Sequence, residues 1–574
     1  MKTLKTIGVL GLVLFSISVA AQATKTIVHG TVTDPNGAVI MGARIIIGNQ
    51  QSGLELGAMT DSAGIFTFTV SPGRYRLTVA QSGFASETRD VEAAAGETVN
   101  MDVALVPAAL SEQVVVVSGS REEELRESST TKVNVLSRQL IRDTGYETVA
   151  DILSEQPGTR IRSALRRAPT VAGEQIQGID SRQVLVLLDG QPLVGARGIK
   201  SGILNLDRQS AGRLDRIEVI KGASSALYGS DAIGGVINLI TREPQYPLES
   251  SFTTSGGSLS QFDFRGDTGF TYKGLTGYLE AERHKANDYD LTPVTFDTTG
   301  PKFRRNDLLL KLKYEFSPRL SLSALTNAYR NKERGRSIGE QGPQFGDTID
   351  SAQNYGLTAD VTLTPLTHLT LRGYFAKYDE NSRIDILNLP QSVDAVGNLN
   401  QRYAKIDAVI GQVIGSRQFL QGGVEWSQDQ YRSFNRVLGD HAGQQVTLVD
   451  AWIHDRLALH DRLALSLGGR YNHHSRYGSY AVPRVGALVR LSNNLRLRAS
   501  FGRGFRAPDL GQLYFRFFNP WRCLWPSTTF LIAPIRVESH TARVRSCRSR
   551  AHVARWSEVE FLPGQDQVER SARR

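Results

Sequence analysis

Few residues of this chain have the type and spacing that catalysis or metal binding requires. A zinc peptidase would need a His-x-x-Glu pair or a His-Glu-x-x-His helix, and neither pattern occurs in the sequence. His473 and His474 could bind a metal or haem, but neighbouring residues of a strand point to opposite faces. Residues 502–507 fit a loose dinucleotide pattern, yet they end a strand-like run and no helix follows. We therefore expect no catalytic, cofactor-binding or metal-binding residues, and we do not expect an enzyme.

The stretch from Gly178 to Arg242 organises the rest of the chain. Its three aliphatic runs are too short for helices and are bounded by Gly, Asp or Pro, so we predict three buried strands. These runs cover residues 184–188, 217–220 and 236–240. Asp189 and Gly190 predict a hairpin turn, because both positions of such a turn need φ > 0. The glycines that follow mark tight corners in a small α/β unit.

The order of these phrases resembles the plug domain of TonB-dependent outer-membrane receptors. The residues that carry the resemblance are Asp189, Gly190, Lys221, Gly222, Tyr228, Gly229, Gly234, Gly235 and Asn238. Gln177 departs from the pattern, since many relatives carry Arg before the glycine, and this weakens any inference about charge pairing there. The alternative is a generic small α/β domain.

Three short helices are expected in the same unit. Ser137 can cap a helix that runs to Asp143, with Gly145 after its end. A second helix, from Thr148 to Glu155, should stop at the following Pro-Gly pair. A third is expected over residues 207–215, leading into the strand at 217–220.

A run of four valines lies in the linker ahead of the plug-like unit. Consecutive β-branched residues favour an extended backbone. The family resemblance implies that this segment is a TonB box, a strand that binds the sheet edge of the inner-membrane energy transducer through main-chain hydrogen bonds. The candidate partner-binding residues are Glu112, Gln113, Val114, Val115, Val116 and Val117. The alternative is an ordinary last strand of the domain that precedes the linker.

The N-terminus has the features of a secretory signal peptide. Lys2 and Lys5 precede an apolar run over residues 7–19, and residues 21–23 offer a small-x-small cleavage site. Short strand-like runs with Gly and Pro punctuation follow up to residue 106, and they predict a small β-sandwich. This sandwich resembles the carboxypeptidase-regulatory-like domain found at the N-terminus of many TonB-dependent receptors.

From about residue 250 the sequence alternates with a period of two. Leu308, Leu310 and Leu312 share one face, whereas Lys311 and Lys313 share the other. An apolar outer face and a polar inner face are typical of a transmembrane β-barrel, and a soluble sandwich is the alternative. Tight turns alternate with long polar connections, which we expect at 331–353 and 379–400 and which favour the barrel. Residues 504–510 then resemble a motif common in the barrels of siderophore and haem receptors of this family, with the motif residues Phe505, Arg506, Ala507 and Pro508.

The pattern ends after Pro520. The last 54 residues lack alternation, contain ten Arg, no Lys and both cysteines, and account for +5 of the net charge of +10. Residues 250–520 supply only about 12–14 strands, fewer than the ~22 of barrels that enclose a plug. We therefore expect an incomplete barrel, inactive in this chain, and a tail translated out of frame; a genuine basic tail is the alternative.

Together these features predict a mainly β protein with a β-sandwich, a small α/β plug and an incomplete antiparallel transmembrane β-barrel. The expected domains are 1–23 signal peptide, 24–106 sandwich, 107–135 linker, 136–245 plug, 246–520 partial barrel and 521–574 tail. The resemblance implies uptake of a scarce ligand across the outer membrane of a Gram-negative bacterium, powered by a TonB-type transducer. A ferric siderophore is the first expectation, with cobalamin, haem or a glycan left open. A secreted adhesin or structural β-protein without transport is the competing function.

Overall fold

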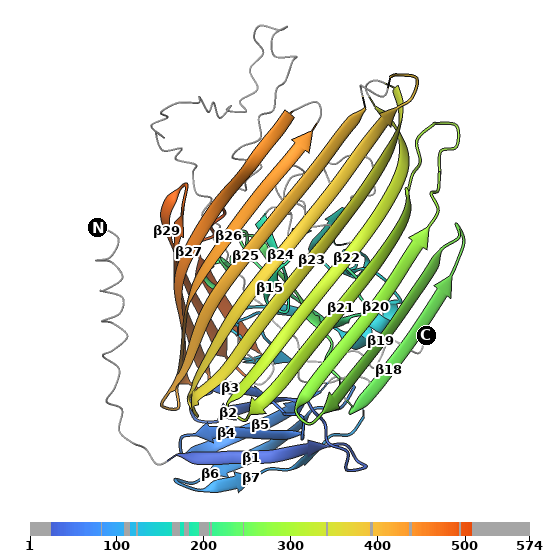
Figure 1. Cartoon of the computed structure of the whole chain (residues 1–574). Helices are drawn as coiled ribbons and strands as arrows, with labels where there is room; N and C mark the ends of the chain where they lie inside the picture. Colours follow the sequence, from blue (N-terminus) through green and yellow to red (C-terminus); the bar gives the residue numbers. More distant parts are fainter. Residues whose placement is uncertain are drawn as a thin grey trace, which may run out of the picture.

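The computed structural model contains an N-terminal β-sandwich, a plug and a large curved wall of strands (Figure 1). The sandwich lies against one end of the wall, and the plug lies on the concave side of the wall. The structure describes residues 25–81, 83–107, 115–121, 124–162, 173–176, 179, 183–194, 206, 209–244, 246–339, 342–390, 394–435, 439–492 and 495–507. The predicted signal peptide, the tail after residue 520, Gln177, Pro508 and Glu112 to Val114 lie outside these residues.

Two small sheets form the N-terminal sandwich, as the alternating runs predict. Its strands are β1 (Thr26–Thr33), β2 (Arg44–Asn49), β3 (Glu55–Met59), β4 (Ile65–Val70), β5 (Gly73–Ala80), β6 (Glu87–Ala93), β7 (Thr98–Asn100) and β8 (Val103–Ala104). One sheet has the order β4-β1-β7, with β8 also on β1, and the other has the order β3-β2-β5-β6. Their inner faces bury one apolar core that includes Ile45, Phe66 and Leu77.

A five-stranded sheet forms the centre of the plug. Its order is β11-β16-β17-β14-β15. The strands of the linker and plug are β9 (Val115–Val116), β10 (Glu124–Leu125), β11 (Val133–Ser137), β12 (Thr159–Arg162), β13 (Gly173–Ile176), β14 (Val184–Leu188), β15 (Gln191–Pro192), β16 (Leu214–Lys221) and β17 (Gly235–Thr241). The three predicted buried strands are confirmed as β14, β16 and β17. Asp189 and Gly190 join β14 to β15 with φ of 46° and 78°, as the hairpin prediction requires.

Two of the three expected plug helices are confirmed. The helices are α2 (Arg138–Thr144), α3 (Val149–Ser154) and α4 (Ser225–Tyr228). Ser137 and Thr148 cap α2 and α3 through their side chains, and Gly145 ends α2 with φ of 66°. The helix expected at 207–215 is wrong: the described residues 209–213 form a bend and a turn before β16. The Arg265 side chain of β19 packs closely against Gly212 in this turn, so a larger residue there would displace it.

The wall is one antiparallel sheet of 13 strands, which confirms the estimate from the sequence. Consecutive strands pair from β18 to β30, and these two strands are the edges of the sheet in the described residues. The strands are β18 (Leu248–Gly256), β19 (Phe262–Tyr272), β20 (Leu275–Ala286), β21 (Lys302–Ser317), β22 (Leu320–Gly339), β23 (Gly342–Thr364), β24 (Thr367–Ile386), β25 (Ala395–Ile414), β26 (Gln418–Asn435), β27 (Gly439–His460), β28 (Leu463–His474), β29 (Gly478–Arg490) and β30 (Arg496–Gly502).

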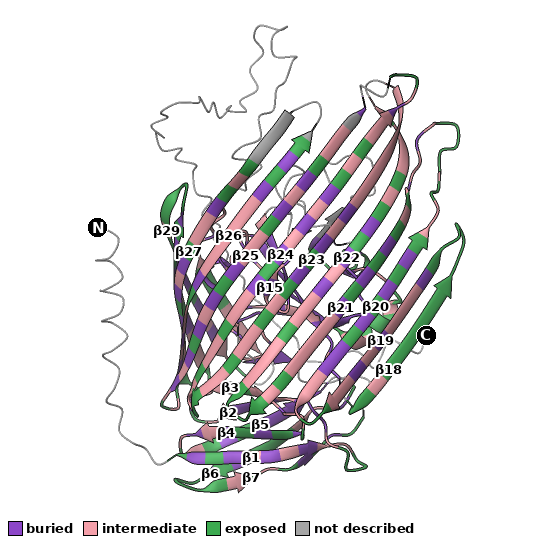
Figure 2. Ribbon diagram, in the orientation of Figure 1, coloured by how far each residue is buried: buried purple, intermediate pink, exposed green. Residues whose placement is uncertain are grey.

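The two faces of the wall differ as the alternation predicts, and Figure 2 shows the alternation of burial along each strand. On β21, Leu308 and Phe316 are exposed on the outer face, whereas Lys311 faces inward and pairs with Glu243 at 2.7 Å. The long polar connections expected at 331–353 and 379–400 are wrong. These residues extend paired strands to the hairpin ends at Gly339 and Ile386, because a polar segment still satisfies its backbone in an antiparallel ladder.

The sandwich packs against the tight turns of the wall. Leu54 is buried with Val413, Phe419 and Ala458, close to the turns that join β25 to β26 and β27 to β28. The Ser62 backbone N–H donates to Glu315 at 3.3 Å. In the residues that the structure describes, no helix is long and apolar enough to cross a membrane.

Candidate functional site

The valine segment forms a short strand between two domains. β9 pairs antiparallel with β10 in a separate two-stranded sheet, so its described residues are not the last strand of the sandwich. The Val115 side chain is buried with Ile46 and Ala80 of the sandwich, whereas Val116 is buried with Val236 of the plug. Both faces of the candidate partner strand are therefore covered.

Glu218 binds the backbone that follows this strand. Its carboxylate accepts hydrogen bonds from the Val117 N–H at 3.1 Å and the Ser118 N–H at 2.8 Å, and from Arg216 Nε at 2.7 Å. Glu218 is 0% exposed, so these charge-assisted bonds form away from water. Sequence reasoning missed this residue, although an acid within the aliphatic run of β16 was a signal that could have found it.

Two of the plug motif residues bind the same linker residue, Ser118. The Tyr228 hydroxyl donates to its carbonyl oxygen at 3.0 Å, and Asn238 Nδ2 donates to its Oγ at 2.9 Å. Asn238 Oδ1 also accepts from the Gly190 N–H at 3.1 Å. Burial raises the pKa of Tyr228 well above its ordinary value, so the phenol stays a neutral donor. The plug motif thus connects the hairpin turn to the linker.

The remaining motif residues shape the plug itself. Asp189 accepts the Thr241 N–H at 2.9 Å, and Lys221 Nζ donates to the Pro157 carbonyl at 2.8 Å. At Gly235 a Cβ atom would lie 2.2 Å from the Ile220 carbonyl oxygen, so only glycine fits. The other motif glycines are Gly222, Gly229 and Gly234, the first two with φ of 96° and 84°.

Arg121 connects the linker to the wall. Its Nη1 donates to Glu425 on β26 at 2.9 Å and to the Leu227 carbonyl of α4 at 3.2 Å. Glu425 also pairs with Arg470 on β28 at 2.7 Å, and Arg470 pairs with Asp450 at 2.6 Å. A cavity of about 150 Å³ adjoins this ion network between plug and wall. These charges were not singled out from the sequence, because each lies in an ordinary alternating strand or a charged linker.

Glu55 connects the sandwich to the β9–β10 hairpin. Its carboxylate accepts from the Leu125 N–H at 3.2 Å and from the Ser128 hydroxyl, and Arg490 of β29 donates to the same hydroxyl at 2.9 Å. Burial raises the pKa of Glu55 to about 7. The hairpin therefore contacts the sandwich, the plug and the wall at once.

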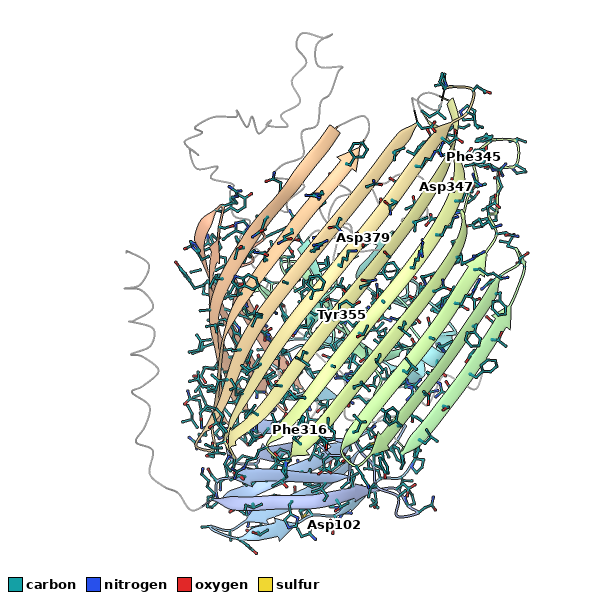
Figure 3. The ribbon with its side chains drawn as sticks, viewed as in Figure 1. Asp102, Phe316, Phe345, Asp347, Tyr355 and Asp379 are labelled. Atoms are coloured by element: carbon teal, nitrogen blue, oxygen red, sulfur yellow. The ribbon has the colours of Figure 1, made fainter. Side chains whose placement is uncertain are left out.

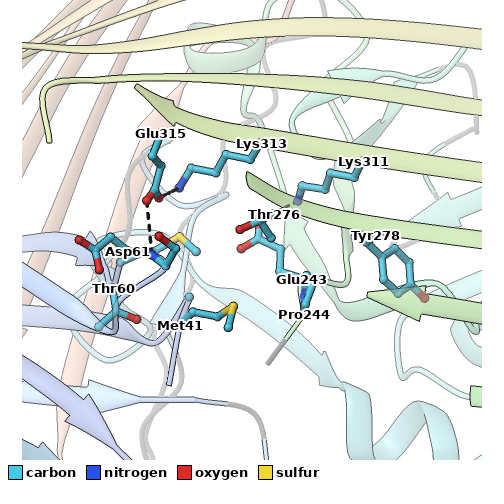
Figure 4. A pocket seen from close by; sticks show the side chains of 13 residues that line it. Met41, Thr60, Asp61, Glu243, Pro244, Thr276, Tyr278, Lys311, Lys313 and Glu315 are labelled. Atoms are coloured by element: carbon cyan, nitrogen blue, oxygen red, sulfur yellow. Dashed lines mark hydrogen bonds and ion pairs between the residues drawn. The ribbon is translucent and has the colours of Figure 1, made fainter. Parts of the chain in front are cut away.

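A second place where sandwich, plug and wall are in contact lies near the start of β18 (Figure 4). Lys311 pairs with Glu243, and Lys313 pairs with Glu315 at 3.1 Å, beside Asp61 of the sandwich. The nearby Lys311 ammonium lowers the pKa of Glu243 to about 2. The pocket here has a volume of about 30 Å³, enough for a water molecule but not for a ligand.

The barrel motif at residues 505–507 packs against the plug next to Tyr228 and Gly229. Phe505 stacks on Tyr480 with ring centroids 4.8 Å apart, and its backbone N–H donates to Ser225 of α4 at 3.2 Å. Arg506 lies 3.5 Å from the Asp231 carboxylate, and the Ala507 N–H donates to Ser230 at 2.9 Å. The structure therefore brings together two motifs that are almost 280 residues apart in the sequence.

The described histidines include a neighbouring pair on β28 and a buried residue, His284, that lies among carboxylates. His473 is exposed and His474 is buried, which confirms that they face opposite sides of β28. His284 lies 2.9 Å from Asp263 and 3.0 Å from Glu282, and the ligand atoms of His284, Glu282 and Asp307 lie close enough together to hold a metal ion. Arg213 and Arg305 pair with Asp307 at 3.4 and 2.8 Å. Because two guanidinium groups already pair with Asp307, we interpret this cluster as an ion network between plug and wall.

Three family models match successive parts of the chain. The carboxypeptidase regulatory-like domain matches residues 27–106, the TonB-dependent receptor plug domain matches 126–236, and the TonB-dependent receptor-like β-barrel matches 242–540. The chain belongs to the TonB-dependent receptor family. The barrel match runs past residue 520, the boundary expected from the sequence, and that boundary stays a prediction.

Curated relatives of this TonB-dependent receptor include transporters and iron-regulated proteins. The chain is 26% identical over 410 residues to the vitamin B12 transporter BtuB of Vibrio cholerae, covering 70% of this chain and 64% of the relative. It is 26% identical over 424 residues to an iron-regulated outer membrane virulence protein of V. cholerae, covering 70% and 61%. The chain thus spans less than two thirds of the length of these relatives. The family lies in the outer membrane of Gram-negative bacteria.

Solved structures share the fold of the receptor. The ferric enterobactin receptor PfeA of Pseudomonas aeruginosa superimposes with a TM-score of 0.58 at 16% identity, covering 69% of this chain and 64% of that one. The ferripyoverdine receptor of the same organism gives a TM-score of 0.58 at 16% identity, covering 71% and 62%. At this identity the likeness shows the fold alone.

Proposed function

We propose that this receptor binds a ferric siderophore for energy-coupled uptake, although we expect the transport step itself to be inactive in this chain because its barrel is incomplete. The similarity to an iron-regulated relative and the phrase at residues 504–507 support this ligand class. Cobalamin is the second candidate, because vitamin B12 transporters of two Vibrio species are among the relatives.

The partner in this proposal is a TonB-type energy transducer that binds Glu112 to Val117 as an added strand. Backbone hydrogen bonds would supply most of the affinity, so a valine run needs no particular side-chain pattern. The position of β9 is the observation that carries the proposal. The strand lies at the plug end that contacts the sandwich, and the side chains of Glu218, Tyr228 and Asn238 bind the residue just after it.

For the transducer to bind, strand β9 must separate from both the plug and the sandwich. Val116 must separate from the plug core, and the Val117 and Ser118 N–H groups must leave Glu218. Val115 must also separate from Ile46 and Ala80 of the sandwich. Ligand binding on the outer side would favour release by shifting the plug, which weakens the contacts of Glu218, Tyr228 and Asn238.

The test measures ligand and partner binding by the purified full chain. Tryptophan fluorescence titrations compare ferric siderophores, cyanocobalamin and haem, and a pull-down measures retention of the transducer's periplasmic domain with and without each ligand. We expect one ferric siderophore to bind and to increase retention. Binding of cyanocobalamin alone would favour the second candidate. If no ligand binds, and if the transducer's periplasmic domain is either not retained or retained equally with and without each ligand, a structural or adhesin-like β-protein is favoured.

A further inference from the structure

A histidine and two carboxylates meet where the plug contacts the first strands of the wall. Figure 3 shows this edge of the wall, the green strands β18 to β20, with the plug behind it. Nδ1 of His284 on β20 lies 2.9 Å from Asp263 on β19 and 3.6 Å from Glu147, in the plug segment between α2 and α3. His284 is 5% exposed and Asp263 is 7% exposed. One ligand atom from each residue lies within 4.8 Å of the other two, and we name these three residues the histidine–carboxylate trio.

Contacts on the other side of the His284 ring orient it. Its Nε2 lies 3.0 Å from Glu282, and the Ser210 hydroxyl donates to the second oxygen of this carboxylate at 2.7 Å. An ionised carboxylate only accepts hydrogen bonds, so Nε2 carries the proton of the neutral ring and Nδ1 presents its lone pair to the trio. Metal-binding histidines almost always donate their second ring N–H in this way.

The Asp263 carboxylate is oriented by its own neighbours. Gln261 and Ser255 donate to its Oδ2 at 2.8 and 3.3 Å, whereas its Oδ1 is the oxygen that faces His284. In the part of the chain that the structure describes, no lysine or arginine forms an ion pair with Asp263 or Glu147. A lone pair that faces two carboxylates repels them, so a cation must lie between these groups. A proton on Nδ1 neutralises one of the two negative charges, whereas a divalent ion neutralises both.

We propose that the histidine–carboxylate trio binds a divalent transition-metal ion, with zinc as the expected metal, between plug and wall. Tetrahedral zinc with bonds of about 2.0 Å places its ligand atoms about 3.3 Å apart. The distances from His284 Nδ1, 2.9 and 3.6 Å, lie on either side of this value. An imidazole ligand favours zinc over magnesium or calcium. All three residues line a cavity of about 520 Å³, which has room for water as the fourth ligand.

The bound metal would hold the plug against the wall. Glu147 belongs to the plug, whereas Asp263 and His284 belong to two paired strands of the wall, so one ion links three elements that are distant in the sequence. This role is separate from the ligand uptake proposed above. Because the three ligands come from separate elements, no local motif in the sequence reveals them.

The test measures Co²⁺ binding, because Co²⁺ occupies zinc sites and its visible absorption reports the coordination. The full chain, with Cys523→Ser and Cys547→Ser, serves as the parent protein; it is stripped with a chelator and titrated with Co²⁺ and then with Zn²⁺. We expect the parent to bind Co²⁺ with a tetrahedral spectrum and to release it when Zn²⁺ is added. Glu147→Gln and His284→Gln should each weaken Co²⁺ binding at least tenfold. The Glu147 side chain is 39% exposed, so the Glu147→Gln protein should remain folded.

Two matched controls change the same residue types outside the trio. Glu155→Gln alters a carboxylate at the end of α3, and His454→Gln alters a histidine of β27 that is 4% exposed; both variants should bind Co²⁺ within twofold of the parent. Zn²⁺ should also slow hydrogen exchange in the segment between α2 and α3 of the parent, and Glu147→Gln should remove this effect. Equal Co²⁺ binding by the parent and both trio variants, equal loss in the controls, or Zn²⁺ binding that leaves this exchange unchanged would overturn the proposal.

Discussion

Glu218 offers the sharpest test of how the candidate partner strand is restrained. Substituting Glu218→Ala removes the acceptor of the Val117 and Ser118 N–H groups, while Arg216 keeps its contact with Asp215 at 3.0 Å. A hydrogen bond to a buried charged group contributes about 1.5–3 kcal/mol, so the two bonds together contribute about 3–6 kcal/mol to the docked linker. In the released linker both N–H groups bind water instead. The lower value corresponds to a roughly 100-fold larger released population.

The assay measures how fast a thiol reagent reaches the strand. Cys523 and Cys547 are replaced by Ser, and Val115→Cys supplies a single thiol at a position that is 5% exposed in the structure. Labelling by a maleimide should be roughly 100-fold faster with Glu218→Ala, and intermediate with Glu218→Gln, which keeps one acceptor oxygen. The control Glu92→Ala changes a carboxylate whose side chain is 78% exposed, and it should leave the rate unchanged.

The reasoning is refuted by equal labelling rates in a Glu218→Ala protein whose thermal midpoint shows that it is folded. Such a result would mean that Tyr228, Asn238 and the apolar contacts of Val116 restrain the linker by themselves.

Three further outcomes are expected. Val115→Pro should abolish binding of the transducer's periplasmic domain in a pull-down, whereas Val115→Ala should weaken it modestly, because backbone bonds dominate; equal tolerance of both would contradict strand addition. Arg470→Met leaves the buried carboxylates of Glu425 and Asp450 without this partner and should lower the free energy of unfolding by about 3–5 kcal/mol. The control Arg76→Met, in an exposed ion pair, should lower it by at most ~1 kcal/mol; both values are measured by denaturant unfolding. Burial raises the pKa of Glu55 from 4.5 to about 7, so between these pH values the docked hairpin holds a proton on Glu55 that the released hairpin loses. Docking of the β9–β10 hairpin should therefore be tightest below pH 4.5 and weaken as the pH rises to 7, as measured by hydrogen exchange. Glu55→Gln should remove this pH dependence.

Local signals in the sequence were sufficient for much of the fold. The aliphatic runs of β14 and β17 and the turn at Asp189 and Gly190 are specified by residues next to one another, so they could be predicted without knowledge of the tertiary structure. The helix predicted at 207–215 is replaced by a turn, and Arg265 from the wall packs against Gly212 there, a long-range contact that no local pattern encodes. The polar hairpin between β22 and β23 was mistaken for a loop because its strands project beyond the apolar band.

The candidate site was harder to predict because its contacts are long-range. Glu218 lies about 100 residues after the backbone that it binds, and Arg121 lies about 300 residues before its partner Glu425. The sequence shows that Glu218 is an unusual acid within the aliphatic run of β16, but it does not show that Glu218 binds the backbone of Val117 and Ser118. The covering of Val115 by the sandwich likewise depends on domain docking, which no local pattern encodes.

The strand order of the plug has a mechanical consequence. β11 is an edge strand of the sheet β11-β16-β17-β14-β15, and the linker that carries β9 leads directly into it. A pull on the linker therefore loads the pair Val133 and Ile220 first, at the end of the ladder nearest the pull. Because β11 pairs on one side only, breaking the β11–β16 ladder is enough to detach it, and β16, β17 and β14 keep their own pairing.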